Sequence, residues 1–172
     1  MTVIAYSARH RIMASDSRMT DSGSHLTTCK KIFRAKTGAL LGLAGDGDAR
    51  DIVRLFERRT KMPSRATLAA LEGELAMIVA RPDGQLFRVC VYYLPAVSAW
   101  IGEVIEIADP FVAIGTGAAY AYGAMSAGAD PIKAVEIACR WDVLCGLPVQ
   151  SEKLRPPVSP TTPGTEPKRE ER

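Results

Sequence analysis

The sequence predicts an α+β protein in which two antiparallel sheets pack on each other and helices cover both outer faces. The chain has 172 residues, which is long enough for one domain with a sizeable core. Its strand-forming and helix-forming segments come in separate blocks, whereas a parallel sheet would require them to alternate. An apolar fraction of 47% and a charged fraction of 24% are typical of a globular domain.

The N-terminal segments predict short strands joined by tight turns. Two apolar segments, 3–8 and 12–15, flank a basic turn and are typical of a β-hairpin. The polar segment 20–24 (TDSGS) favours a loop. Two further strands are expected over 31–34 and 39–43. The second of these is apolar throughout, as in a strand that is buried on both faces.

The middle of the chain predicts helices followed by a hairpin. A glycine-rich turn offers Asp46 or Asp48 as the N-cap of a helix, and apolar residues then recur at helical spacing to Phe56. Pro82 and Gly84 suit the turn of a hairpin. The segments expected here are a short helix at 65–75, hairpin strands at 75–80 and 86–93, and a further strand at 97–107.

The C-terminal part predicts one more strand, two helices and a tail. A buried strand over 111–114 leads through a glycine turn into a helix of small residues at 118–127, and a proline opens a second helix at 131–141. The segment 151–172 carries five prolines and almost no apolar residues, so we expect it to be disordered. The predicted folded domain is therefore 1–150.

Charge, hydropathy and cysteine spacing argue against several functional classes. The net charge is only +3 and is scattered, so nucleic acid is not an expected partner. No apolar run reaches the ~18 residues of a membrane span, and we expect a cytoplasmic protein with no membrane partner. Neither a metal nor another cofactor is expected, because no CxxC pair occurs among the four cysteines, Cys29, Cys90, Cys139 and Cys145.

Thr2 directly follows the initiator methionine. If Met1 is removed, Thr2 carries a hydroxyl and a free α-amine on the same residue. This is the pairing of nucleophile and base used by N-terminal threonine hydrolases. An α-amine, with an unperturbed pKa of ~7.7–8.0, is a suitable base near neutral pH.

An ordered set of motifs resembles the β-subunits of proteasomes. The similarity is greatest to HslV-type peptidases, especially the small versions of phages and prophages, and it extends from residue 1 to about residue 149. The resemblance implies the N-terminal nucleophile hydrolase fold, a four-layer αββα sandwich. The motifs, in order, are ASDSR at 14–18, KKI at 30–32, LAG at 43–45, IGTG at 114–117, AYAYG at 119–123 and WD at 141–142.

The resemblance implies a nucleophile and its activating charges. Thr2 would be the nucleophile, Lys31 the catalytic lysine beside its hydroxyl, and Asp16 the aspartate that orients Lys31. Since neighbouring residues of a strand face opposite sides, only one of Lys30 and Lys31 can point inward, and we expect it to be Lys31.

Three further residues have implied roles around the nucleophile. Gly45 would supply the backbone N–H of an oxyanion hole. Thr116 and Asp142 would lie near the α-amine. The structural alternatives remain open: Gly45 would suit any tight turn between a strand and a helix, and Asp142 could simply end a helix.

The implied activity is that of a threonine endopeptidase in a self-compartmentalising homo-oligomeric ring. Its substrates would be unfolded polypeptides or peptides, and an ATP-dependent unfoldase would be a further partner. One alternative is a catalytically inactive ring subunit, and another is a small-molecule amidase. The hairpin from Thr2 to Asp16 is two residues shorter than in typical proteasome subunits. A different alignment would place Met1 at the nucleophile position and leave the subunit inactive.

Overall fold

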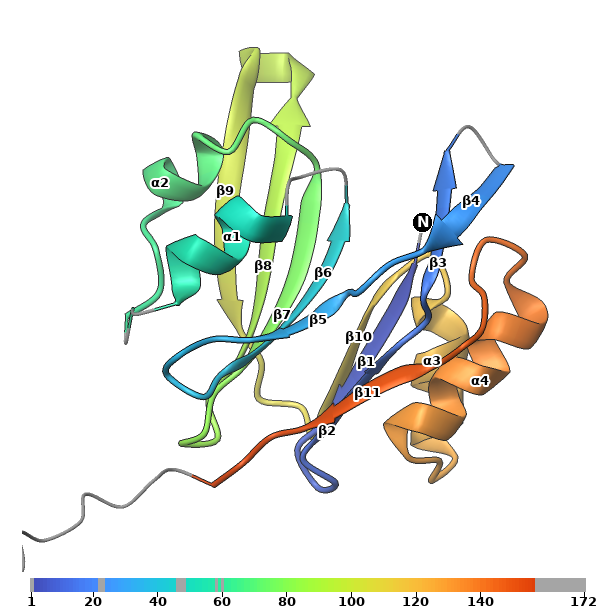
Figure 1. Cartoon of the computed structure of the whole chain (residues 1–172). Helices are drawn as coiled ribbons and strands as arrows, with labels where there is room; N and C mark the ends of the chain where they lie inside the picture. The colour runs from blue at the N-terminus through green and yellow to red at the C-terminus, as the bar shows by residue number, and fades with distance from the viewer. Residues whose placement is uncertain (1, 22–23, 46–48, 58, 60, 157–172) are drawn as a thin grey trace, which may run out of the picture.

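The computed structural model describes residues 2–21, 24–45, 49–57, 59 and 61–156. Two antiparallel sheets face each other, and each carries a pair of helices on its outer side (Figure 1). The coarse prediction of an α+β sandwich of antiparallel sheets is therefore confirmed.

The first sheet has the strand order β10-β1-β2-β11. Its strands are β1 (Val3–Ser7), β2 (Ile12–Ser15), β10 (Phe111–Gly115) and β11 (Gln150–Lys153). The predicted N-terminal hairpin is present, with Ile4 opposite Ser15 and Ser7 opposite Ile12. Strand β1 lies in the interior of this sheet, because β10 pairs with its other edge.

The second sheet has five strands in sequence order, β5-β6-β7-β8-β9. They are β5 (Ile32–Arg34), β6 (Leu40–Gly45), β7 (Leu75–Ala80), β8 (Leu86–Leu94) and β9 (Ala99–Glu106). A short 3-10 turn over Pro95–Val97 connects the last two strands, so β9 begins later than the predicted residue 97.

Four described helices cover the outer faces of the sheets. They are α1 (Ala49–Phe56), α2 (Arg65–Ala69), α3 (Ala118–Ser126) and α4 (Pro131–Trp141). Helix α2 is shorter than the predicted 65–75, since the chain turns at Glu72 with a φ of +47° and enters β7 at Leu75. None of the described helices combines the length and the apolar character of a membrane span.

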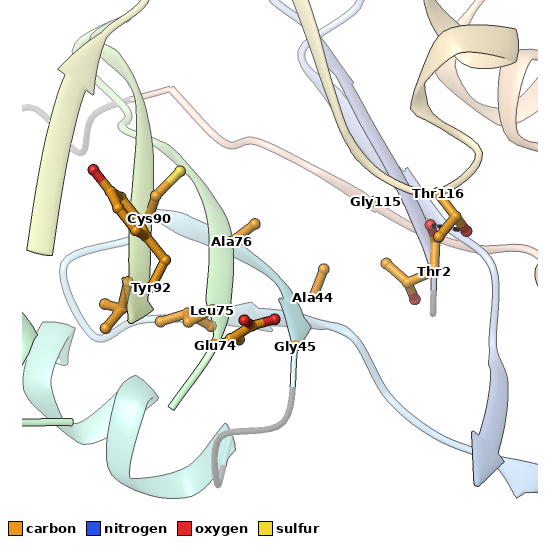
Figure 2. Close-up of a pocket in the computed structure, with 11 residues that line it drawn as sticks. Thr2, Ala44, Gly45, Glu74, Leu75, Ala76, Cys90, Tyr92, Gly115 and Thr116 are labelled. Atoms are coloured by element: carbon orange, nitrogen blue, oxygen red, sulfur yellow. Dashed lines mark hydrogen bonds between the residues drawn. The ribbon is translucent and has the colours of Figure 1, made fainter. Parts of the chain in front are cut away.

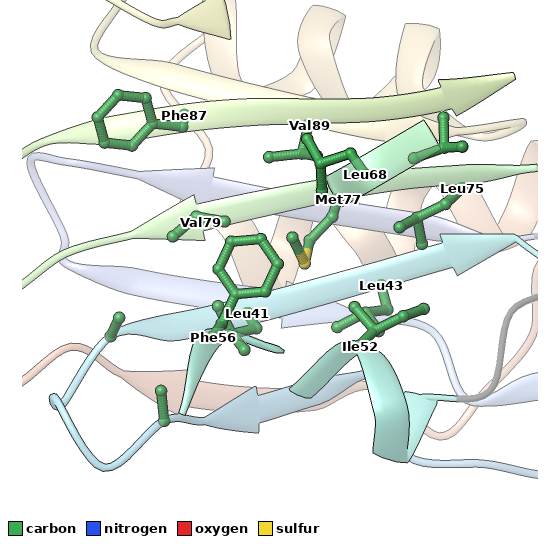
Figure 3. Close-up of a cluster of buried hydrophobic side chains, with 13 residues drawn as sticks. Leu41, Leu43, Ile52, Phe56, Leu68, Leu75, Met77, Val79, Phe87 and Val89 are labelled. Carbon is green, nitrogen blue, oxygen red and sulfur yellow. The ribbon is translucent and has the colours of Figure 1, made fainter. Parts of the chain in front are cut away.

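Three apolar clusters separate the four layers. One lies between the second sheet and helices α1 and α2, and includes Leu41, Met77 and Phe56 (Figure 3). A second fills the space between the sheets, with Ile4 and Ile78 at its centre. The third joins the first sheet to α3 and α4. Each sheet therefore buries both faces, as the continuous apolar runs indicate.

The prediction of a loop over 20–24 is wrong for the residues that the structure describes. Strands β3 (Arg18–Asp21) and β4 (Ser24–Thr28) form a two-stranded ribbon there. The polar composition of this segment favours turns. A ribbon outside the two sheets can nevertheless form from such residues, because its strands are held by backbone pairing and do not need an apolar face. The predicted N-cap of α1 at Asp46 or Asp48 lies outside the described residues.

The predicted domain boundary at residue 150 is also wrong. Strand β11 pairs with β2, and Leu154 is buried in the cluster between the sheets. Backbone pairing with β2 and the buried side chain of Leu154 hold this edge strand, although its composition resembles that of a linker. The fold thus includes most of 150–156, and the rest of the predicted tail, 157–172, lies outside the described residues.

The two sheets pack tightly at Gly42, and replacing this residue with alanine should destabilise the protein. A Cβ at this position would lie 2.7 Å from Ile4 Cγ2 and 2.8 Å from Met13 Sδ. Overpacking of this kind costs about 1–3 kcal/mol. We expect Gly42→Ala to lower the free energy of unfolding in urea by that amount.

Gly123→Ala is the matched control, because a Cβ there meets no atom within 4 Å and the residue lies in α3. Alanine in a helix is more favourable than glycine by about 1 kcal/mol, so this variant should be at least as stable as the wild type. Equal effects of the two substitutions would contradict the packing of the sheets described above.

Candidate functional site

Strand β1 directs Thr2 into the space between the sheets. Side chains alternate along a strand, and Ile4 lies in the cluster between the sheets while Val3 packs toward α3 and α4. Thr2 shares the side of Ile4 and is 3% exposed. Gly115 lies directly against it, since a Cβ on Gly115 would be 2.1 Å from the Thr2 carbonyl oxygen.

The Thr2 hydroxyl joins a buried ion pair. Lys31 Nζ donates a hydrogen bond to Thr2 Oγ1, and it lies 2.8 Å from Asp16 Oδ1. Thr2 Oγ1 in turn donates to Asp16 Oδ1 over 3.0 Å. The backbone carbonyl of Arg18 also accepts from Lys31 Nζ, at 2.7 Å. Lys31 therefore places a positive charge directly on the threonine oxygen.

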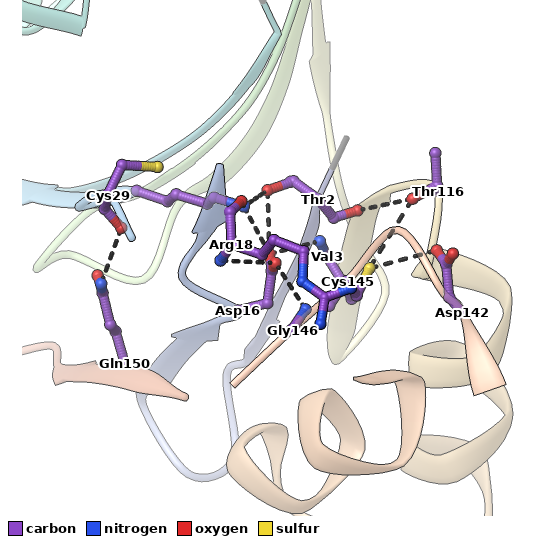
Figure 4. Close-up of polar contacts among 11 residues, drawn as sticks. Thr2, Val3, Asp16, Arg18, Cys29, Thr116, Asp142, Cys145, Gly146 and Gln150 are labelled. Carbon is purple, nitrogen blue, oxygen red and sulfur yellow. Dashed lines mark hydrogen bonds and ion pairs between the residues drawn. The ribbon is translucent and has the colours of Figure 1, made fainter. Parts of the chain in front are cut away.

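Three backbone N–H groups hold the carboxylate of Asp16. Val3 N donates to Oδ1 at 3.0 Å, while Arg18 N and Gly146 N donate to Oδ2 at 3.2 and 3.1 Å. Figure 4 shows these bonds converging from separate parts of the chain. Asp16 is fully buried, so its charge depends on these donors and on Lys31. The carboxylate acts as a fixed anion that orients the lysine.

The structure decides which lysine points inward. Lys31 is 6% exposed, as expected for the inward residue. Lys30 is exposed, and its ammonium lies 5.7 Å from the centroid of the Phe33 ring. The prediction that Lys31 is the inward member of the pair is confirmed.

The short hairpin delivers Thr2 to Lys31. Pairing of Ile4 with Ser15 is followed by a bond from Asp16 N to Val3 O at 3.1 Å, which places Asp16 beside the start of β1. The register thus accommodates the shorter loop with Thr2 at the ion pair. Met1, which the alternative alignment would place there, lies outside the described residues.

Gly45 stands at the end of β6, across the pocket from Thr2. Leu43 N donates to the carbonyl oxygen of Lys31, the residue just before β5. Successive N–H groups of a strand point to opposite edges, so those of Leu43 and Gly45 point to the same edge. The N–H of Gly45 is therefore directed toward this edge, next to the chain that precedes β5. Its φ of +131° and the close backbone of Glu74 restrict this position to glycine, because a Cβ would lie 2.1 Å from Glu74 O.

Thr116 and Asp142 lie on the other side of Thr2. Thr116 Oγ1 donates to the Thr2 carbonyl at 3.4 Å. Asp142 is the C-cap residue of α4 and accepts from Leu144 N at 2.9 Å and from the Cys145 thiol at 3.2 Å. Burial raises the pKa of Asp142, but hydrogen bonds from Thr116, Leu144 and Cys145 outweigh it and hold this pKa below its usual value.

Cys145 is a hydrogen-bond donor here rather than a nucleophile. Burial and the bond to Asp142 raise the pKa of its thiol to about 12, and a thiol that stays protonated reacts poorly. Its sulfur also lies 3.8 Å from Thr116 Oγ1. The thiol thus serves this side of the site as a donor to Asp142.

A pocket of about 680 Å³ opens beside Thr2 between the two sheets (Figure 2). Thr2, Gly115 and Thr116 form one wall, and β6, β7 and β8 form the other. The pocket is large enough for several substrate atoms beyond the reacting group. The residues that line it are Thr2, Ala44, Gly45, Glu74, Leu75, Ala76, Cys90, Val91, Tyr92, Gly115 and Thr116.

The structure therefore brings Thr2, Asp16 and Lys31 into direct contact, places Thr116 on the Thr2 backbone, and sets Gly45 across the pocket. Asp142 hydrogen-bonds with Thr116, which in turn contacts the Thr2 carbonyl. Sequence reasoning missed the backbone of Gly146 and the side of the pocket formed by β7 and β8. No local signal could have found them, because Gly146 lies 130 residues from Asp16.

Neither the protein-family models nor the curated proteins gave a match to this sequence. The described residues also contain no group of three or more histidine, cysteine or acidic side chains arranged to hold a metal ion.

Removing both members of the ion pair should cost less stability than the sum of the two single removals. Breaking a buried pair leaves an uncompensated charge and costs about 3–5 kcal/mol. We expect Asp16→Asn and Lys31→Met each to lower the free energy of unfolding by that amount. The double variant should lose clearly less than the sum, by about 1–3 kcal/mol.

An exposed pair provides the control for this cycle. Lys133 and Glu136 lie 2.9 Å apart on the surface of α4, and surface pairs contribute at most about 1 kcal/mol. Strict additivity of Asp16→Asn and Lys31→Met in urea denaturation would contradict a coupled buried pair.

The lowered pKa of Asp142 predicts how stability depends on pH. Its ionised form is favoured by folding, so the carboxylate stabilises the protein above the unfolded-state pKa of ~3.9 and loses this effect as pH falls through the lower folded-state value. Asp142→Asn should therefore lower the melting temperature at pH 7. The difference from wild type should shrink below about pH 4. A difference that grows toward acid would show that the sign is wrong.

Proposed function

We propose that the protein is an N-terminal threonine peptidase in which Thr2 is the nucleophile once Met1 has been removed. One observation carries the proposal: the Thr2 hydroxyl lies in a buried ion pair, where Lys31 Nζ donates to Oγ1 and Asp16 holds the lysine. A buried threonine at a strand end needs no such partner for folding. The resemblance to HslV-type peptidases and the layered fold support the same assignment.

Acylation begins at the Thr2 hydroxyl. The free α-amine of Thr2 accepts the hydroxyl proton, and Oγ1 attacks the carbonyl carbon of the substrate. Lys31 stabilises the negative charge that develops on Oγ1, because its ammonium already contacts this atom. The α-ammonium then gives its proton to the leaving nitrogen as the C–N bond breaks. The product is an ester between Thr2 and the acyl part of the substrate.

Gly45 supplies the donor for the tetrahedral intermediate. Its N–H is directed toward the edge where Lys31 lies, and it borders the same pocket as Thr2. A backbone donor aimed at a developing oxyanion contributes about 3–4 kcal/mol to transition-state stabilisation.

Hydrolysis of the ester restores the enzyme. The α-amine takes a proton from water, the hydroxide attacks the ester carbon, and Thr2 Oγ1 leaves and regains the proton. Thr116 and Asp142 orient the backbone of Thr2 during both steps, since the Thr116 hydroxyl lies within hydrogen-bond reach of both the Thr2 carbonyl and Asp142. Thr116 and Asp142 thus position the α-amine of Thr2, which is the base, and do not contact the substrate.

The proposal extends to substrate and assembly. The substrates are peptides or unfolded polypeptides, the fold is that of the N-terminal nucleophile hydrolases, and the subunits form a homo-oligomeric ring that an ATP-dependent unfoldase supplies. An inactive ring subunit would assemble without hydrolysing peptides. A small-molecule amidase would act as a monomer, so native mass spectrometry together with a peptide assay separates the three functions.

The first test is the state of the N-terminus and the dependence of activity on Thr2. Intact mass spectrometry should show a chain without Met1. A peptide epoxyketone, which bonds both a hydroxyl and a neighbouring α-amine, should add once per chain. Thr2→Ala should abolish the adduct and lower kcat/KM for peptide hydrolysis more than about 10³-fold, because it removes the nucleophile.

Thr2→Ser is the matched control, since it retains the hydroxyl and the α-amine. It should keep measurable activity, although serine lacks the methyl group that restricts χ1 of threonine. Retention of Met1 in the purified protein, or hydrolysis that persists in Thr2→Ala, would overturn the proposed mechanism.

A further inference from the structure

The side chains that line the pocket beside Thr2 carry one kind of charge. Among the described residues that line it, Glu74 has the single charged side chain. Glu74 forms no ion pair with any other residue that the structure describes. A carboxylate without a partner at the rim of an otherwise uncharged pocket attracts a cationic group.

The backbone holds Glu74 in place. Its carbonyl oxygen packs against Gly45, where a Cβ would approach to 2.1 Å, and Leu75, the next residue, pairs with Gly45 across the strands. Figure 2 shows the Glu74 carboxylate beside Gly45, on the side of the pocket that faces Thr2. The charge therefore lies close to the residue proposed to bind the oxyanion.

The wall between Glu74 and the pocket interior suits an aliphatic chain. Ala76 and Cys90 lie opposite each other on β7 and β8, and Tyr92 is the next residue of β8 on the same face. These side chains present carbon and sulfur to the pocket and leave room for a long substituent. Lysine and arginine side chains combine such an aliphatic stem with a cationic head.

Two charged residues that adjoin the pocket lining, Lys31 and Glu103, have hydrogen-bond partners. The ammonium of Lys31 contacts Asp16, Thr2 and the Arg18 carbonyl. Glu103, across from Cys90 on β9, hydrogen-bonds with Tyr92, and Arg65 lies near enough to act on the same phenol. Glu74 thus remains the group that faces a bound substrate.

We infer that this pocket selects peptide substrates with a lysine or arginine side chain beside the scissile bond, and that Glu74 is the specificity-determining residue. The inference rests on the proposed peptidase function. It adds a substrate class that the ion pair at Thr2 does not itself imply.

The test uses capped alanine pentapeptides whose central residue is arginine, norleucine or glutamate. Every other residue is alanine, so a peptide can place its central side chain in the pocket on whichever side of the scissile bond the pocket lies. Wild-type protein should cleave the arginine peptide about two- to fivefold faster than the norleucine peptide, the range expected for an ion pair with the exposed Glu74. The glutamate peptide should be the slowest.

Three variants identify the group responsible. Glu74→Gln should remove the preference for arginine, and Glu74→Lys should reverse it in favour of glutamate. Glu106→Gln is the matched control, because it removes the same charge from an exposed site on β9 outside the pocket lining. An arginine preference that survives in Glu74→Gln, or one that Glu106→Gln removes equally, would overturn the inference.

A binding measurement separates this inference from the proposed peptidase function. The same peptides, labelled with fluorescein, are titrated against the Thr2→Ala variant with and without Glu74→Gln, and binding is followed by fluorescence anisotropy. Arginine-selective binding that needs Glu74, without hydrolysis by the wild type, would support the pocket and refute the peptidase. Hydrolysis that depends on Thr2 but shows no charge preference would support the peptidase and refute the role of Glu74.

Discussion

The buried ion pair between Lys31 and Asp16 is the interaction on which the rest of the site depends. Two charges removed from water are stable only if further hydrogen bonds compensate their lost hydration. Here the compensating donors and acceptors come from β1, from the chain after β2 and from the loop after α4. The pair therefore connects three segments of the chain through hydrogen bonds, and Lys31 also donates to the Thr2 hydroxyl.

The ion pair lies beside the pocket that opens between the two sheets. Strand β1 lies inside the first sheet, so pairing on both edges restrains Thr2, and helices α3 and α4 support it from behind. On the open side the sheets leave the pocket bounded by β6, β7 and β8. A rigid strand end beside an accessible pocket gives a reacting group a defined direction of approach, which is the geometric requirement for catalysis by positioning.

The loop after α4 supplies hydrogen-bond donors to both acidic residues of the site. Gly146 donates its N–H to Asp16, and the Cys145 thiol donates to Asp142, which in turn receives the Thr116 hydroxyl. A thiol is a weaker donor than a hydroxyl, but burial keeps it protonated and therefore always a donor.

Local patterns in the sequence predicted most strands and helices, the hairpin of β1 and β2, and the inward direction of Lys31, because alternation and helical spacing act within a few residues. They did not predict the β3–β4 ribbon or the edge strand β11, whose compositions resemble those of loops. Nor could they place Thr2 at the ion pair, Gly146 on Asp16, or Glu74 at the pocket that Thr2 lines. Strand register and the packing of the two sheets determined those contacts, since they join residues far apart in the chain whose proximity no local propensity encodes.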